Sequence, residues 1–121
     1  MKAIAFRSKK AKGQRLEKKV AQRIREMGLD KDAKRMPASG SMYGWESDIF
    51  THLPFRFEIK NQENVRLWEF WGQAKAQEGP YKPAVLIVGG NYRSPLACMD
   101  LDTFLNLLKE IKDYKDKLGT L

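Results

Sequence analysis

The segment PAVLIVGG, residues 83–90, is the feature that most limits what this chain can fold into. No polar side chain interrupts it, and such a continuous apolar run is typical of a strand buried on both faces. The segments ESDIFTH and FRFEIKN, residues 46–52 and 55–61, predict two further strands around a short turn with Pro54. A short strand is also predicted in SPLACMD, residues 94–100. These segments indicate a mixed central sheet.

Three helices are predicted around this sheet. Residues 13–27 carry apolar side chains at helical spacing, namely Leu16, Val20, Ile24 and Met27. Gly28 directly after them is a suitable helix stop. A second helix is predicted at about residues 67–78, and a third from residue 101 to about residue 117, with Asp100 or Asp102 as its N-cap. The order of elements predicts an α/β fold with helices flanking the sheet.

Length and composition favour one cytoplasmic domain. The chain has 121 residues without repeats or a linker long enough to divide two domains, so we expect one domain, residues 1–121, with a basic N-terminal segment, residues 1–12. No apolar run is long enough for a signal peptide or a membrane span, so no membrane partner is expected, and the compartment is the cytoplasm, or the host cytoplasm if the source is viral. The single Cys98 is expected to be a buried apolar side chain.

The charge balance indicates a polyanionic partner. The chain has 23 Lys and Arg against 15 Asp and Glu, a net charge of +8. Such an excess most often favours nucleic acid, although a basic run can also serve only to hydrate a surface. Residues 1–25 hold many Lys and Arg but a single acidic residue, Glu17. Because Glu17 falls in the same helical arc as Leu16, Val20 and Ile24, it is expected to point toward the core.

A pair of charged residues stands on one predicted strand. Glu58 and Lys60 alternate with Phe57 and Ile59, so they project from one face of that strand. If the two strands from residues 46–61 pair as a hairpin, Asp48 and Glu58 converge. Adjacent carboxylates repel unless a cation neutralises them, and hard oxygen ligands suit Mg²⁺ or Mn²⁺. The alternatives are a surface Glu58–Lys60 ion pair and an Asp48 that caps a turn.

These residues together resemble the PD-(D/E)xK nucleases. That resemblance implies a restriction-endonuclease-like αβββαβ core, and it is closest to the small archaeal-type Holliday junction resolvases. It rests on the order of Glu17, Asp48 and Glu58-x-Lys60, on a Ser/Gly loop at residues 38–41, and on a KGxRxE start, here Lys12-Gly13-Gln14-Arg15-Leu16-Glu17. The chain departs from the family pattern in having Ser47 where the name-giving proline stands.

The resemblance also implies roles. Asp48 and Glu58 would hold Mg²⁺, for which Mn²⁺ substitutes, together with the carbonyl of Ile59. Glu17 would join the metal ligands, directly or through water, and Lys60 would be the catalytic lysine. Gln73 on the second helix is expected to support the site. Combined with the basic N-terminal segment, the expected DNA contacts are Lys9, Lys10, Lys12, Arg15, Ser39, Ser41 and Gln62.

The function expected from this resemblance is cleavage of branched double-stranded DNA. Such a resolvase acts as a homodimer and cuts four-way junctions by symmetric nicks that leave 5′-phosphate ends. Two alternatives stay open: a repair or restriction-type endonuclease of the same superfamily, and a non-catalytic nucleic-acid-binding module. His52 is expected to be structural, and the aromatic residues Trp68, Phe70 and Trp71 are expected to serve the core or a dimer contact.

Overall fold

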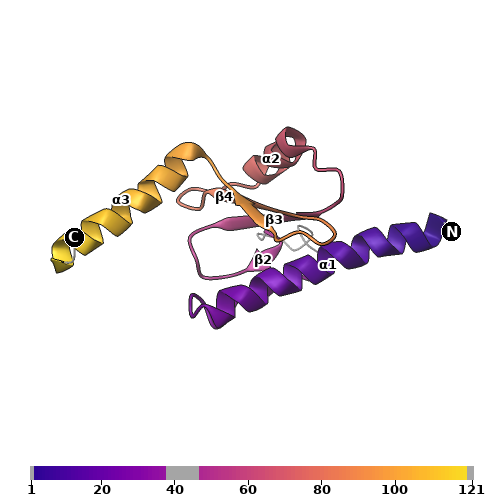
Figure 1. Cartoon of the computed structure of the whole chain (residues 1–121), viewed down its shortest axis with the longest axis horizontal. Helices are drawn as coiled ribbons and strands as arrows, with labels where there is room; N and C mark the ends of the chain where they lie inside the picture. Colours follow the sequence, from indigo (N-terminus) through magenta and orange to yellow (C-terminus); the bar gives the residue numbers. More distant parts are fainter. Residues whose placement is uncertain (1, 38–46, 120–121) are drawn as a thin grey trace.

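The computed structural model of the chain describes residues 2–37 and 47–119, with residues 2–10 described without their side chains. Its elements follow the order α-β-β-β-α-β-β-α (Figure 1). They are α1 (Lys2–Glu26), β1 (Lys34–Arg35), β2 (Ile49–Phe50), β3 (Arg56–Asn61), α2 (Leu67–Ala76), β4 (Ala84–Gly89), β5 (Leu96–Cys98) and α3 (Leu101–Leu118). The predicted restriction-endonuclease-like α/β fold is confirmed.

The strands form a mixed arrangement. β3 runs parallel to β4, and β5 pairs antiparallel with the other side of β4, so β4 is the central strand. β1 and β2 form a separate antiparallel pair, in which Lys34 lies opposite Phe50. The chain just before β2 reaches β3, because the Asp48 N–H donates to the Phe57 carbonyl over 2.9 Å. The predicted site residues Asp48, Glu58 and Lys60 therefore lie at β3, an edge strand of the three-stranded sheet.

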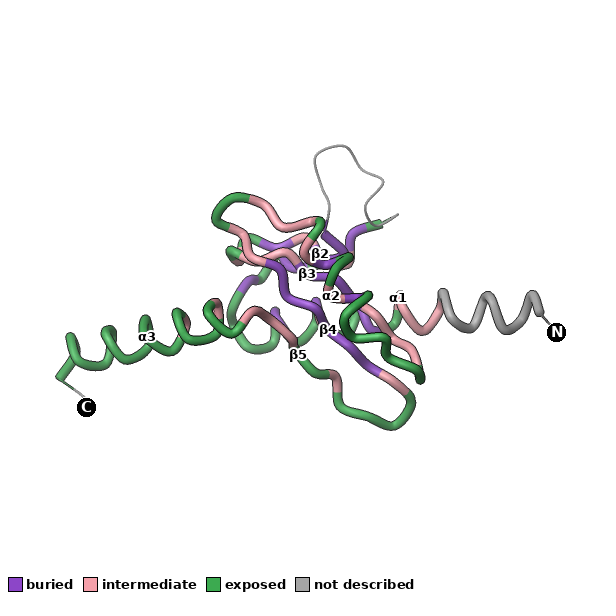
Figure 2. Tube along the Cα trace, turned by 90° about the horizontal axis from the view of Figure 1, so that it is seen from above, coloured by how far each residue is buried: buried purple, intermediate pink, exposed green. Residues whose placement is uncertain are grey.

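Helices cover both faces of the sheet. On the α1 face, Leu16 and Ile24 pack with Phe57, Ile59 and Ile87 of the strands. On the α2 face, apolar side chains of α2 pack against β4, and this cluster contains Phe70, Ala74, Ala84, Leu86 and Val88. Every residue of β4 is buried (Figure 2). Burying one large apolar side chain contributes about 1.5–3 kcal/mol, so the two faces hold β4 firmly between the helices.

The ends of the first two helices differ from the predictions. α1 begins at Lys2 rather than at residue 13, so most of the basic N-terminal segment belongs to this helix. Its end is as predicted, because Gly28 takes a φ of +73°, which favours glycine. Met27, expected in the buried stripe, lies just beyond the helix and is 61% exposed. α2 ends at Ala76, earlier than predicted, and Leu67 is 40% exposed.

α3 extends away from the sheet and buries none of its described side chains (Figures 1 and 2). Asp100 occupies the predicted N-cap position, but its side chain makes no capping bond and accepts a 2.9 Å hydrogen bond from Lys75 Nζ. Cys98 is half-buried rather than buried, and Trp68, expected in the core or a dimer contact, is 80% exposed. Within the described residues, no helix combines the length and apolar character needed to span a membrane.

Candidate active site

The backbone between the β1–β2 pair and β3 is fastened by Ser47 and Asp48. The buried Ser47 hydroxyl accepts hydrogen bonds from the N–H groups of Phe57 and Ile49, at 3.0 and 3.3 Å, and donates to the Phe57 carbonyl at 3.2 Å. Asp48 Oδ2 accepts from the Ile59 N–H over 2.7 Å. Ser47, which stands where the family pattern has a proline, therefore fastens the segment before β2 to β3 through its hydroxyl. Among the described residues the predicted hairpin is not formed, because β2 pairs with β1, but Asp48 still reaches the Glu58 strand as predicted.

Glu58 is a buried carboxylate in an unfavourable electrostatic position. Its pKa is raised to about 7 because burial disfavours the charged form and because the Asp48 charge lies nearby. The charge of Lys60 and hydrogen bonding with Lys60 and Gln77 oppose this rise. Glu58 Oε2 has no hydrogen-bond partner among the described residues. A buried carboxylate oxygen without a donor is costly, so this atom is available to a ligand.

Lys60 lies beside Glu58 on the same face of β3. Its Nζ is 3.6 Å from Glu58 Oε1 and 5.3 Å from the centroid of the Phe70 ring. A cation over an aromatic face is attracted by the ring quadrupole, so the buried Phe70 of α2 helps to hold the ammonium near the carboxylate. Phe70 thus belongs to the core, as predicted, and also contacts the candidate site.

The glutamine beside the site is Gln77 rather than Gln73. Gln73, the predicted support, is exposed on α2, whereas the half-buried Gln77 follows the last residue of the helix and interacts with Glu58. The two glutamines are four residues apart, so helical periodicity places both on one face and does not distinguish them. Only the packing of α2 on the sheet shows that Gln77, at the end of the helix, is the glutamine that reaches Glu58.

Glu17 approaches from the opposite face of the sheet, on α1. It is buried, as predicted from its helical arc, and its Oε2 accepts a 2.8 Å hydrogen bond from Nε of Arg35 in β1. Glu17, Asp48 and Glu58 do not form a group whose ligand atoms all lie within 4.8 Å in the described part of the chain. Arg35 was missed by the sequence reasoning, because its partner is distant in the chain.

The predicted DNA contacts are distributed unevenly. Arg15 is exposed on α1, and the half-buried Lys12 uses its carbonyl to accept a 2.9 Å hydrogen bond from Asn61 Nδ2. Gln62 is half-buried just after β3, and its N–H donates to the Gly89 carbonyl over 3.0 Å. The remaining predicted contacts fall on parts that are not described: the side chains of Lys9 and Lys10, and the loop residues Ser39 and Ser41.

A second acidic cluster lies between the turn after α1 and the loop after β2. Ligand atoms of Asp30, Asp32 and His52 all lie within 4.8 Å of one another. Asp30 accepts hydrogen bonds from Thr51 Oγ1 and the His52 N–H, both at 2.6 Å, and from the Asp32 N–H at 2.9 Å. The Thr51 hydroxyl and these amides lower the pKa of Asp30 to about 2. These bonds, one of them from the backbone of His52, tie the two loops together, and the structural role of the His52 side chain stays a prediction.

Comparison with known proteins identifies the family. Residues 8–119 match the family described as "Phage putative PDDEXK endonuclease". The chain therefore belongs to this family and, through it, to the PD-(D/E)xK nuclease superfamily, whose members are generally dependent on divalent metals and act on DNA. No curated protein and no solved structure matches the chain. The family match spans nearly the whole chain, including Glu17, Asp48, Glu58 and Lys60.

Proposed function

We propose that this protein is a Mg²⁺-dependent DNA endonuclease that resolves four-way junctions, with Asp48, Glu58 and Lys60 as its catalytic residues. The observation that carries the proposal is the unpartnered, buried Glu58 Oε2 next to the Asp48 charge. A hydrated surface carboxylate keeps a low pKa, whereas this one sits near 7 without a cation. A site that is costly when empty and rich in oxygen ligands supports metal binding.

The donor set fits a hard divalent cation. Asp48 and Glu58 each supply a carboxylate, and the Ile59 carbonyl follows Glu58 directly on β3. Glu17 belongs to the proposed set through water, in keeping with its bond to Arg35. When bound, Mg²⁺ would activate water as a nucleophile and offset charge on the phosphoryl oxygens.

The chain's own residues supply positioning and charge. Lys60 Nζ lies 3.6 Å from Glu58 and over the Phe70 ring, and in the proposed reaction it would donate to a phosphoryl oxygen and stabilise the negative charge that develops during hydrolysis. Asp48 is oriented by the Ile59 N–H, which holds its carboxylate against β3. Gln77 donates toward Glu58 and favours its ionised form.

The choice of a junction as substrate rests on symmetry. A four-way junction must be cut on two opposed strands, so a resolvase presents two active sites in a twofold dimer. α3 offers an apolar stripe at heptad spacing, made of Leu101, Phe104, Leu108, Ile111 and Leu118. All five side chains are exposed, each by 45% or more. Such a stripe on an 18-residue helix favours pairing with the same helix of a second copy.

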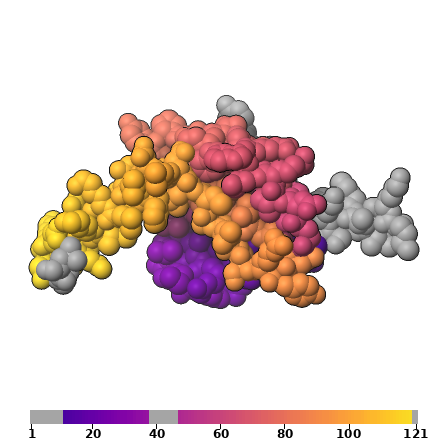
Figure 3. Space-filling view, turned by 45° about the horizontal axis from the view of Figure 1, so that its top comes forward, coloured from indigo at the N-terminus to yellow at the C-terminus, as the bar shows by residue number. Residues whose placement is uncertain are grey.

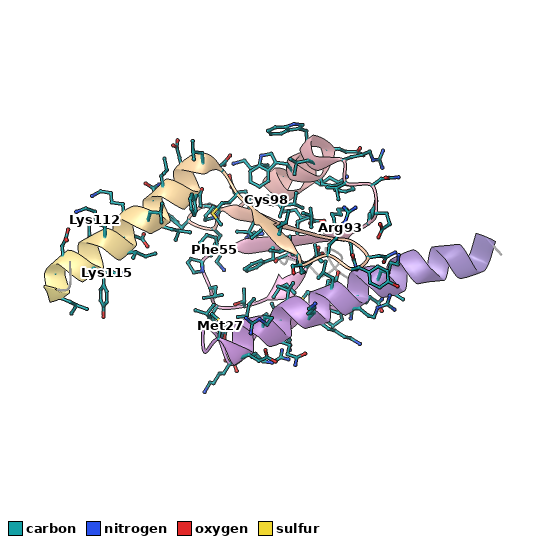
Figure 4. All side chains as sticks on the ribbon, viewed as in Figure 1. Met27, Phe55, Arg93, Cys98, Lys112 and Lys115 are labelled. Atoms are coloured by element: carbon teal, nitrogen blue, oxygen red, sulfur yellow. The ribbon has the colours of Figure 1, made fainter. Side chains whose placement is uncertain are left out.

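The polar face of α3 agrees with pairing through the apolar stripe. The i,i+4 ion pairs Lys109–Asp113 and Lys112–Asp116, at 3.2 and 2.8 Å, keep these four charged side chains beside one another along the helix. Lys112 and Lys115, labelled in Figure 4, lie on the part of α3 that projects beyond the sheet. Apart from Lys115, which falls within the heptad positions, the stripe is apolar, and a single polar residue there can specify register.

The test combines oligomeric state with substrate choice. Sedimentation should give a dimer, and the double variant Leu108→Glu with Ile111→Glu should give a monomer that keeps its helical content. With Mg²⁺, the dimer should cut a synthetic four-way junction at paired symmetric positions and leave a linear duplex of the same sequences intact. A monomer that cuts both substrates equally would instead support a repair or restriction-type endonuclease. Binding of both substrates without cleavage by either would support a non-catalytic module.

A further inference from the structure

A basic pocket lies where the ends of β3 and β4 meet α1. It has a volume of about 260 Å³ and is open to solvent. The residues that matter for its chemistry are Arg15, Lys19, Asn61, Gly89, Gly90 and Arg93. Arg93 lies on the turn between β4 and β5 and is labelled in Figure 4. In the space-filling view the orange β4–β5 segment lies against the indigo-to-purple α1 (Figure 3). Residues distant in the chain therefore form one pocket.

Its three cationic side chains lack counter-charges within the described residues. No ion pair there includes Arg15, Lys19 or Arg93, although Arg35 and Lys60 nearby in the fold both pair with carboxylates. Like charges gathered around one concave site repel, and an anion placed among them relieves the repulsion. Guanidinium groups in particular match phosphate, because their N–H groups donate in a planar fork.

The walls of the pocket are shaped by glycine. A Cβ added at Gly89 would lie 2.9 Å from Leu16 Cδ2 and 3.2 Å from Asn61 Oδ1, so the end of β4 approaches α1 more closely than other residues allow. Glu63, the acidic side chain beside this turn, accepts a 2.5 Å hydrogen bond from the Asn91 N–H. It fixes the turn and forms no ion pair with Arg93 in the described structure.

The pocket lies at a short distance from the candidate active site. Asn61 follows Lys60 directly and stands three residues after Glu58 on β3. Three residues of a strand span about 10 Å. Phosphates of one DNA strand wind around the duplex axis and therefore lie farther apart than their axial rise of about 3.4 Å, so this span corresponds to a phosphate close to the cut. Asn61 contacts Lys12 of α1, whereas Lys60 contacts Phe70 of α2, so the two sites lie on opposite sides of the end of β3.

We propose that this pocket binds a backbone phosphate of the DNA strand that is cut, within a few nucleotides of the scissile bond. The inference rests on the proposed nuclease function and extends it, because Lys19 and Arg93 join Arg15 as phosphate contacts. The pocket binds a DNA strand that passes the end of β3, and it sets the position of that DNA strand relative to Glu58 and Lys60. It contributes to binding and register, and takes no part in the chemical step.

The test is DNA binding by the full-length protein as a function of salt. Fluorescence anisotropy with a synthetic four-way junction in EDTA measures affinity without cleavage. For Lys19→Gln with Arg93→Gln we expect at least about tenfold weaker binding near 0.1 M salt, and a salt slope lower by about 1, since each neutralised phosphate contributes about 0.9. The control is Lys18→Gln with Lys31→Gln, which removes the same charge from exposed positions outside the pocket. Unfolding curves confirm that both variants are folded, and Arg93→Gln alone is the second variant.

A second measurement locates the phosphate. Neutral methylphosphonates are placed singly at positions within about five nucleotides of the cut. One of these positions should weaken binding by the wild-type protein and have a smaller effect on Arg93→Gln, which lacks one of the three cations of the pocket. Equal salt slopes for pocket and control variants, or no position at which the two proteins differ, would overturn the proposal. If the pocket variant binds DNA more weakly but the wild-type protein never cleaves the junction, the nuclease function is refuted and the phosphate site is still supported.

Discussion

The two acidic clusters of this protein contain similar side chains in opposite electrostatic states. At β3, Glu58 beside Asp48 has a pKa raised to about 7 and an oxygen without a partner. In the loops after α1 and β2, Asp30 beside Asp32 has a pKa lowered to about 2 and accepts three hydrogen bonds. The difference lies in the donors that surround each carboxylate, because donors stabilise the ionised form and burial without donors destabilises it.

This contrast distinguishes a buried carboxylate with an unpartnered oxygen from one whose two oxygens both accept hydrogen bonds. The loop cluster has the closer set of ligand atoms, within 4.8 Å, yet both oxygens of Asp30 already serve neighbouring groups. Glu58 is buried beside a like charge, and its Oε2 has no donor among the described residues. Judged by the proximity of acidic residues alone, the loop cluster would be the better candidate metal site. Judged by which carboxylate oxygens lack hydrogen-bond donors, the better candidate is the site on β3.

The largest expected effect is on catalysis. Asp48→Asn, Glu58→Gln and Lys60→Ala should each lower Mg²⁺-dependent cleavage about a thousandfold, because each removes a contribution of several kcal/mol and 1.36 kcal/mol corresponds to tenfold. Asp32→Asn in the loop cluster should stay near wild type. Initial rates on a labelled four-way junction measure the effect. Near-normal cutting by any β3 variant, or loss of cutting with Asp32→Asn, would reverse the contrast between the clusters.

The next effect concerns metal binding without DNA. A cation at about 100 times its Kd stabilises the folded protein by about 2.7 kcal/mol, which raises the melting temperature by several degrees. This Mg²⁺-induced rise should disappear in Glu58→Gln and persist in Asp32→Asn. Thermal unfolding followed by circular dichroism, with and without Mg²⁺, gives the comparison. If only Asp32→Asn abolished the rise, the loop cluster would be the metal site.

A third effect is that the two clusters respond to pH in opposite directions in metal-free protein. Because the folded pKa of Glu58 is about 7 against an ordinary 4.5, its stabilising contribution is full below 4.5 and is lost as pH rises through 7. Glu58→Gln should therefore gain stability relative to wild type over that window. The contribution of Asp30, with its pKa near 2 against 3.8, is present above 3.8 and is lost as pH falls through 2.

Melting temperatures measured in EDTA from pH 2 to pH 8 test both directions. The difference between Glu58→Gln and wild type should widen from pH 4.5 to pH 7 and then level off. Asp30→Asn should melt below wild type above pH 3.8, and that deficit should shrink at lower pH. A difference independent of pH for Glu58→Gln would show that its carboxylate is not under electrostatic stress in the folded state.

The smallest expected effect comes from the single amide near Glu58. Removing Gln77 should raise the pKa of Glu58 further, because its hydrogen bonding favours the charged form. Gln77→Ala should therefore lower cleavage a few-fold near neutral pH and shift the acid limb of the pH–rate profile to higher pH. Gln73→Ala on the exposed side of α2 serves as the matched control. Identical profiles for the two variants would remove Gln77 from the site.

Local patterns predicted much of the fold and the centre of the site. The apolar run at β4, the Glu-x-Lys alternation at β3 and the helical spacing of Leu16, Val20 and Ile24 depend on neighbouring residues in the chain. They identified the central strand, the charged face of β3 and the inward position of Glu17. Helix ends were less predictable, because the start of α1 at Lys2 and the exposure of Met27 depend on where packing stops.

The sequence by itself determined which residues alternate, which face of a helix is apolar, and that carboxylates and a lysine occur in a nuclease-like order. Only the tertiary structure decided that Gln77 rather than Gln73 contacts Glu58, that Arg35 neutralises Glu17, and that Lys19 and Arg93 share a pocket. The physical reason is that periodicity fixes direction from a single element, whereas partners on different elements depend on how the elements pack. Hydrogen-bond supply, and with it the pKa of each acid, follows from that packing.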